Sequence, residues 1–211
     1  MPESSRLNGS SSGVQLDFVE REATPRELMR LSIQLHLSEL SISNTVSVLE
    51  RLGIKRARST IHNWVQKANL QPTTGSQPDH VALDETVIQL DDQRYWLYAA
   101  VDPETNKFLH VKFYPTRTTA LTEMFLSELR EKHDVQDAVF LVDSAPWLKA
   151  ALHHLGLRFR YEKHGNRNAV ERLFKEIKRR TTQFGNCFRN ADPATAETWL
   201  QSYAYCWNQL I

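Results

Sequence analysis

Three acidic residues stand where carboxylates could act together on a phosphodiester. Asp84 lies within an apolar stretch, Asp143 directly follows another, and Glu171 belongs to a helical pattern. Transfer of a phosphodiester needs no reactive side chain, because carboxylates can hold two divalent cations that activate the attacking oxygen and stabilise the leaving oxygen. Lys178, two helical turns beyond Glu171, adds a positive charge suited to a phosphate. The expected chemistry is metal-dependent cleavage or transfer of a phosphodiester bond.

Each acid also has a structural explanation. Asp84 could lie on a polar strand face, although aspartate is depleted in strands, and its neighbour Glu85 should point to the opposite side. Asp143 could be the N-cap of the helix that follows it. Glu171 could form an i, i+4 ion pair with Lys175. The three are more informative in their order along the chain than singly.

The elements that must position these acids form a mixed pattern from residue 80 onward. The expected strands are His80–Leu90, Arg94–Val101, Lys107–Tyr114, Ala138–Val142 and Leu157–Tyr161. The expected helices are Thr118–His133, Pro146–Leu155, Asn168 to about Thr182, and one from Ala194 onward. The order βββαβαβα predicts an α/β fold with a ribonuclease-H-like core, with helices on both faces of the sheet.

The helix from Asn168 has two stripes at helical spacing. The apolar stripe contains Val170, Leu173, Phe174 and Ile177. The polar stripe contains Asn168, Glu171, Lys175 and Lys178. Glu171 should therefore lie at the margin of the buried face, where it can reach the sheet.

The N-terminal part predicts three short helices. The first should begin after Thr24, with that hydroxyl as its N-cap, the second should span about Ser43–Leu52, and the third should begin at Ser59. The third helix has the polar outer face of a helix-turn-helix recognition helix, whose side chains meet bases and phosphates. Its candidate DNA-binding residues are Arg58, Thr60, His62, Asn63, Gln66 and Lys67. A plain three-helix bundle would also have a polar face. The expected organisation is a flexible arm (1–23), a helix-turn-helix domain (24–70), a linker (71–79) and a catalytic domain (80–211).

Composition restricts the classes of protein. The net charge of the chain is only +1. Residues 158–180, however, contain nine Lys/Arg and only three Glu, and this local positive charge suits an anionic substrate. Cys187 and Cys206 have neither metal-site nor disulfide spacing, so a reducing compartment is expected. The sequence contains neither an apolar run of membrane-spanning length nor a signal peptide, which predicts a cytoplasmic protein.

These motifs resemble those of the DDE transposases of bacterial and archaeal insertion sequences, and are most similar to the short, cointegrate-forming insertion-sequence-six family. The residues that carry the resemblance are Ser59–Val65, Ala82–Thr86, Tyr95–Asp102, Leu141–Asp143, Asn168–Glu171 and Lys178. One departure is that only 28 positions separate Asp143 from Glu171, fewer than is usual in that family. A shortened loop before the last catalytic helix would account for it.

The resemblance implies a transposase that binds terminal inverted repeats, frees a 3′ hydroxyl at the element end and transfers it to target DNA. Asp84 and Asp143 would share Mg²⁺ or Mn²⁺, with Glu171 completing a two-ion site. Lys178, with Lys175, Arg179 and Arg180, would contact phosphates of double-stranded DNA. At least a homodimer is implied, because two element ends must be held together. Two alternatives stay open: a DNA-binding regulator with an inactive nuclease-like domain, and a nuclease for RNA–DNA hybrids or junctions.

Overall fold

The computed structural model describes most of the chain. The described residues are Val14, Leu16, Phe18, residues 24–162, Gly165, residues 168–183, Phe188 and residues 190–211. The expected flexible arm (1–23) lies largely outside these residues, and so does Cys187. No helix in the described ranges combines the length and the apolar character needed to span a membrane.

The N-terminal unit consists of three short helices packed around an apolar centre. They are α1 (Arg26–Ser38), α2 (Ile42–Arg51) and α3 (Arg58–Ala68). Ile33, Leu49 and Trp64, one from each helix, are fully buried. The Ser41 side chain caps α2 by accepting from Asn44 N–H. The expected cap of α1 was wrong: Pro25 takes that position, and the Thr24 hydroxyl accepts from Arg56 Nε at 2.9 Å instead.

The C-terminal unit is built on a five-stranded mixed sheet of order β3-β2-β1-β4-β5. The strands are β1 (His80–Leu90), β2 (Gln93–Asp102), β3 (Lys107–Tyr114), β4 (Val139–Val142) and β5 (Phe159–Tyr161). The first three form an antiparallel meander, and β4 and β5 add in parallel beside β1. β4 is short, apolar and largely buried, as expected for a strand that helices cover, whereas β5 is mostly exposed.

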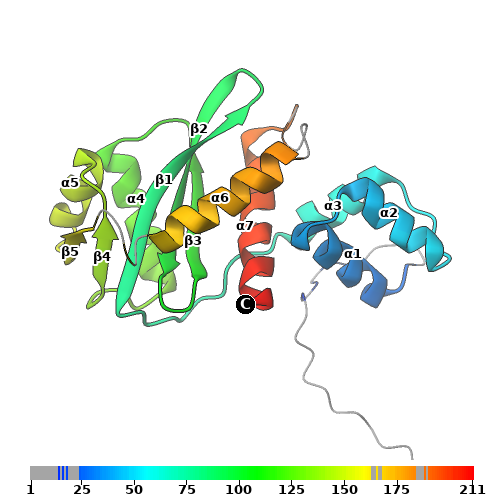
Figure 1. Cartoon of the computed structure of the whole chain (residues 1–211), viewed down its shortest axis with the longest axis horizontal. Helices are drawn as coiled ribbons and strands as arrows, with labels where there is room; N and C mark the ends of the chain where they lie inside the picture. The colour runs from blue at the N-terminus through cyan, green and yellow to red at the C-terminus, as the bar shows by residue number, and fades with distance from the viewer. Residues whose placement is uncertain are drawn as a thin grey trace, which may run out of the picture.

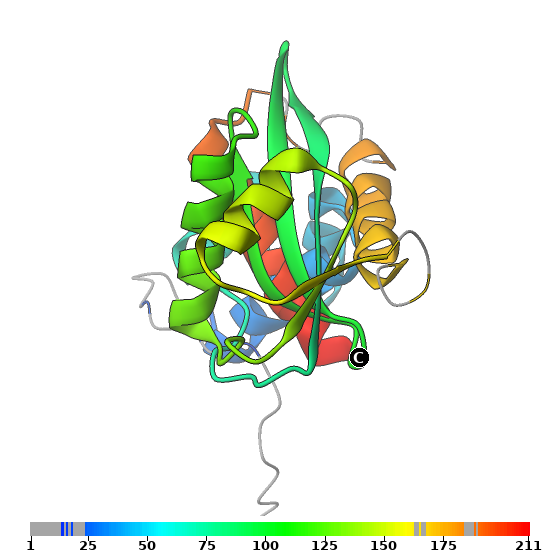
Figure 2. The same cartoon turned by 90° about the vertical axis from the view of Figure 1, so that its left-hand side faces the viewer.

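Helices cover both faces of this sheet, and the ribonuclease-H-like fold is confirmed. They are α4 (Thr119–Lys132), α5 (Pro146–His154), α6 (Asn168–Gln183) and α7 (Pro193–Leu210). Figure 2 shows α4 and α6 on opposite sides of the sheet. Alternation along β1 separates the two cores: Val81 and Leu83 face α4 and α5, whereas Ala82 and Ile88 face α6 and α7.

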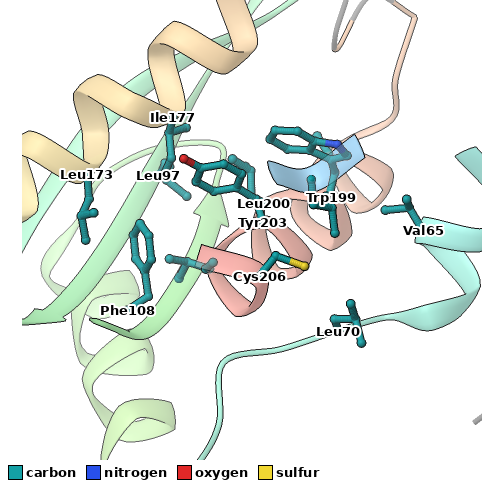
Figure 3. Close-up of a cluster of buried hydrophobic side chains, with 14 of the residues drawn as sticks. Val65, Leu70, Leu97, Phe108, Leu173, Ile177, Trp199, Leu200, Tyr203 and Cys206 are labelled. Carbon is teal, nitrogen blue, oxygen red and sulfur yellow. The ribbon is translucent and has the colours of Figure 1, made fainter. Parts of the chain in front are cut away.

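Helix α7 joins the two units of the molecule. It lies between the sheet and the three N-terminal helices (Figure 1). Figure 3 shows Trp199 and Tyr203 of α7 among side chains from the sheet, from α6 and from α3, which supplies Val65. One continuous apolar cluster therefore extends from the DNA-reading candidate helix to the sheet, so the helices and the sheet pack as one body.

Candidate active site and nucleic-acid interface

Asp84 lies within β1, and Asp143 directly follows β4, the strand beside β1 in the sheet. β1 and β4 pair in parallel with Ala82 opposite Leu141, two residues before each aspartate, and the charges of both aspartates act on Glu85. Asp84 is 9% exposed within β1, and Asp143 is half-buried just after β4. The structure places both carboxylates on or directly beside the sheet, and their role as metal ligands stays a prediction.

Backbone donors hold one oxygen of each aspartate. Asp84 Oδ1 accepts from Glu85 N–H at 2.9 Å, and Asp143 Oδ1 accepts from Ala145 N–H at 2.8 Å. Each bond favours one orientation of the carboxylate that accepts it. Carboxylate oxygens are the ligands that Mg²⁺ and Mn²⁺ prefer, so the donor chemistry of this pair fits a divalent cation.

Glu171 lies apart from this pair in the described structure. It projects from the first turn of α6, the helix that covers the Asp84 face of the sheet, and its side chain is exposed. Within the described ranges, no three Asp, Glu, His or Cys side chains lie close enough together to hold an ion. The buried stripe of α6 is as expected, with Val170 and Ile177 fully buried, and Lys175 and Lys178 are exposed.

Beside the aspartates is a cluster that the sequence did not predict. The Glu85 carboxylate, only 4% exposed, accepts from Trp147 Nε1 at 3.0 Å and lies 3.5 Å from Arg117 Nη1. The Arg117 guanidinium lies 3.9 Å from the ring centre of Trp96 and 4.3 Å from that of Trp147, so it makes cation–π contacts with both indoles. Burial raises the pKa of Glu85 to about 7, and the neighbouring charge of Asp84 adds to the rise.

The sequence carried little signal for this cluster. Glu85 and Trp147 are 62 positions apart, and neither lies in a local pattern that names its partner. The sequence signal that could have indicated it was Glu85, a second charged residue in β1, whose other side chains are largely apolar. Because strand neighbours point to opposite faces, Glu85 had to be either exposed or paired on the α4–α5 side.

The far end of α6 is bound to the C-terminal end of α1. Arg180, 1% exposed, donates to the carbonyls of Glu39 at 2.8 Å and of His36. Arg179 pairs with the carboxylates of Glu39 and Glu176. A cation at the end of a helix also interacts favourably with the helix dipole. The expectation that Arg180 contacts DNA is therefore not supported, because its guanidinium is enclosed between α6 and α1.

His36 completes this junction in its neutral form. Trp199 Nε1 donates to His36 Nε2 at 3.2 Å, while His36 Nδ1 lies 3.0 Å from the Leu40 carbonyl. Both contacts are satisfied when Nδ1 carries the proton and Nε2 accepts. Burial lowers the pKa of His36 to about 4, and the charge of Arg180 acts in the same direction.

The predicted DNA-binding residues of α3 fall into two groups. Exposed side chains on the outer face are Arg58, His62, Asn63 and Lys67, with Thr60 half-buried. Gln66 is turned toward α7 and donates from Nε2 to the Thr195 carbonyl at 3.2 Å. A cavity of about 560 Å³ lies where α3 meets α7, with Arg58, His62 and Gln66 among its lining residues. The exposed group lies at the surface, and its DNA-binding role stays a prediction, whereas Gln66 contacts α7.

Comparison with known proteins identifies the family. Residues 79–205 match the family model DDE_Tnp_IS240, described as a DDE domain. The chain belongs to this family. A relative in Methanocaldococcus jannaschii, an uncharacterized protein, is 31% identical over 182 residues, which are 86% of this chain and 84% of the relative.

Solved structures with some similarity to this DDE protein are retroviral integrases. The catalytic core domain of BIV integrase has a TM-score of 0.43 at 14% identity and covers 59% of this chain and 82% of its own. The catalytic core domain of HTLV-2 integrase, solved with magnesium, has a TM-score of 0.43 at 16% identity and covers 59% of this chain and 85% of its own.

Proposed function

We propose that this DDE protein is the transposase of an insertion sequence of the short, cointegrate-forming insertion-sequence-six type. It binds the terminal inverted repeats of its element, cleaves DNA at the element end and transfers the freed 3′ hydroxyl to target DNA. The observation that carries this proposal is the placement of Asp84 within β1 and of Asp143 directly after the paired strand β4, inside the segment that matches the DDE family.

The aspartates and Glu171 have separate tasks in this proposal. Asp84 and Asp143 would hold Mg²⁺ or Mn²⁺, and bound ions would supply activation of the attacking oxygen and charge stabilisation of the leaving oxygen. Glu171, which lies apart from the pair in the structure, would complete the ligand set if α6, the helix on the Asp84 side of the sheet, brought its carboxylate to the aspartates. Lys175 and Lys178, exposed on the same helix, contact DNA phosphates next to the scissile bond.

The three N-terminal helices provide recognition of the element end. The exposed face of α3 offers Arg58 and Asn63, which can each make two hydrogen bonds to a base edge, and Lys67, which suits a phosphate. Two ends must be joined in one complex, so the active form is a homodimer or a larger assembly on double-stranded DNA.

A strand-transfer assay tests this proposal. Full-length protein is incubated with Mg²⁺, target plasmid and a labelled duplex that carries the DNA flanking its gene. We expect nicked and joined products from the wild type, and a loss of about 10³-fold or more in Asp143→Asn, because several kcal/mol of charge stabilisation depends on the metal. Asp137→Asn makes the same change at a fully exposed position a few residues earlier and should keep wild-type activity.

The remaining outcomes distinguish the alternatives. Binding to the element end without any product, in wild type and Asp143→Asn alike, would contradict the proposal and favour a regulator with an inactive domain. Cleavage of RNA–DNA hybrids or junctions without joined products would instead indicate a nuclease.

A further inference from the structure

A side-chain hydrogen bond links β1 to the start of α5, close to Asp84 and Asp143. Glu85 immediately follows Asp84 along β1, and Trp147 lies four residues after Asp143. The hydrogen bond from Trp147 Nε1 to Glu85 Oε1, 3.0 Å long, joins these two segments on the α4–α5 side of the sheet. Each end of the link is therefore only a short piece of backbone away from one of the two aspartates.

The indole of Trp147 is held on its face as well as at its N–H. Arg117, from the segment between β3 and α4, lies over the Trp147 ring at 4.3 Å and has its Nη1 3.5 Å from the same Glu85 oxygen. A ring fixed at its edge and at one face has little rotational freedom. Helix α5 consequently has a defined position relative to β1.

The segment between Asp143 and Trp147 is short and internally bonded. Ala145, which is buried, donates its N–H to Asp143 Oδ1 at 2.8 Å, and Pro146 begins α5 with a restricted backbone. A displacement of Trp147 is therefore transmitted to the Asp143 carboxylate with little slack.

Burial of a carboxylate at the position of Glu85 lowers the stability of the fold unless an interaction compensates for it. Its side chain is 4% exposed, and its Oε2 has no hydrogen-bond partner among the described residues. An apolar side chain of similar size could fill the space without the cost of desolvating a charge. The requirement that best accounts for Glu85 is an acceptor for the Trp147 N–H at this point of β1.

We propose that Glu85 and Trp147 are positioning residues that set the separation and orientation of Asp84 and Asp143 for the divalent cation. This inference rests on the proposed function, because it assigns the aspartates to the metal. Partners that orient metal-binding carboxylates typically contribute about 10- to 100-fold to metal affinity or activity.

Direct measurement of Mn²⁺ binding to the full-length protein, without DNA, tests the inference. Calorimetric titration is compared for the wild type, Trp147→Phe, Glu85→Ala and Glu85→Gln. Trp147→Phe keeps an aromatic ring over Arg117 but removes the N–H, and should weaken Mn²⁺ binding about tenfold. Glu85→Ala should weaken it at least as much. Glu85→Gln keeps an oxygen acceptor for the indole and should bind Mn²⁺ more tightly than Glu85→Ala.

A matched control separates positioning from general stability. Trp207→Phe, on α7, removes another indole N–H, which donates to the Asn106 carbonyl at 3.1 Å. This variant should leave the Mn²⁺ affinity unchanged. The free energy of unfolding in urea is measured for every variant. A purely structural role for the link predicts lower stability in Trp147→Phe with Mn²⁺ affinity equal to that of the wild type. If Glu85→Ala does not fold, the comparison of Trp147→Phe with Trp207→Phe still decides.

The two proposals fail in different ways. Mn²⁺ binding by the wild type that is lost in Asp84→Asn but unchanged in Trp147→Phe and Glu85→Ala overturns the positioning inference alone. Absence of Mn²⁺ binding by the wild type overturns the metal-dependent function, and the inference with it.

Discussion

The part of the sheet that carries Asp84 and Asp143 and the helix that carries Glu171 are held in place by different interactions. The aspartates follow from strand pairing: β1 is hydrogen-bonded to β2 on one side and to β4 on the other, and backbone N–H groups hold both carboxylates. Glu171 is exposed on α6, which is held by apolar packing along its length and by Arg180 at its far end. The two parts of one proposed site therefore depend on different interactions.

Through Arg180, α6 is also connected to the N-terminal unit. The carbonyls that bind Arg180 belong to α1 and the residue that follows it, and α1 packs with α3, the candidate DNA-reading helix. A displacement of the N-terminal helices would shift α6 through this junction. The aspartates would move less, because strand pairing holds them in place. Substitutions on α6 and at the junction test how far the two parts depend on each other.

The largest effect is expected from the carboxylate of Glu171 itself. Glu171→Gln should lower the rate of strand transfer by about 10²- to 10³-fold, since a lost metal ligand removes several kcal/mol of charge stabilisation. Initial rates of joined product provide the measurement. Glu176→Gln makes the same change on the same helix and should remain near the wild-type rate. Full strand-transfer activity in Glu171→Gln would show that the aspartates do not need the Glu171 carboxylate.

Removal of the Arg180 guanidinium should produce an intermediate effect. Arg180→Met leaves the carbonyls of His36 and Glu39 without their charged donor, so the free energy of unfolding should fall by about 3 kcal/mol. Strand transfer should also slow, because α6 loses its anchor at α1. Urea denaturation and initial rates measure the two effects. Arg179→Met, at an exposed ion pair, should cost much less stability. Equal losses in both variants would argue against a special role for the buried guanidinium.

The smallest effect is a pH dependence that originates in His36. Its pKa is about 4 in the folded protein, below the ordinary value of 6.5 that the unfolded chain retains, so the unfolded chain binds more protons between these values. Stability from the neutral imidazole is complete above pH 6.5 and is lost as the pH falls toward 4. Between pH 7 and pH 5 the wild type should lose about 2 kcal/mol more than His36→Gln, as measured by urea denaturation. Parallel losses in both proteins would assign the pH dependence to other groups, such as His110.

Prediction from the sequence succeeded where a local pattern was sufficient. The strands from His80, Lys107 and Val139 and the helices after Tyr114 were found within a few residues of their observed limits, because their periodicities are regular. The cap of α1 was missed, since the Thr24 hydroxyl forms its bond with Arg56, 32 residues away. Local rules cannot choose between a cap and a distant partner.

The candidate site shows the same division. The positions of Asp84 and Asp143 could be predicted because each is tied to a recognisable strand. The pairing of Glu85 with Trp147, the burial of Arg180 and the turn of Gln66 toward Thr195 could not be, because each joins segments more than 60 residues apart. The sequence alone identified three carboxylates and a polar helix face.

Sequence by itself determined the ribonuclease-H-like order of elements and the membership in a DDE family, since these rest on periodicity and on short motifs. Tertiary structure decided which charges face solvent and which are enclosed. Arg179 and Arg180 are neighbours of one type, yet the first lies at the surface and the second is buried beneath α1. The physical reason is that periodicity sets the direction of a side chain around its own helix, whereas its surroundings depend on which distant element packs against that face.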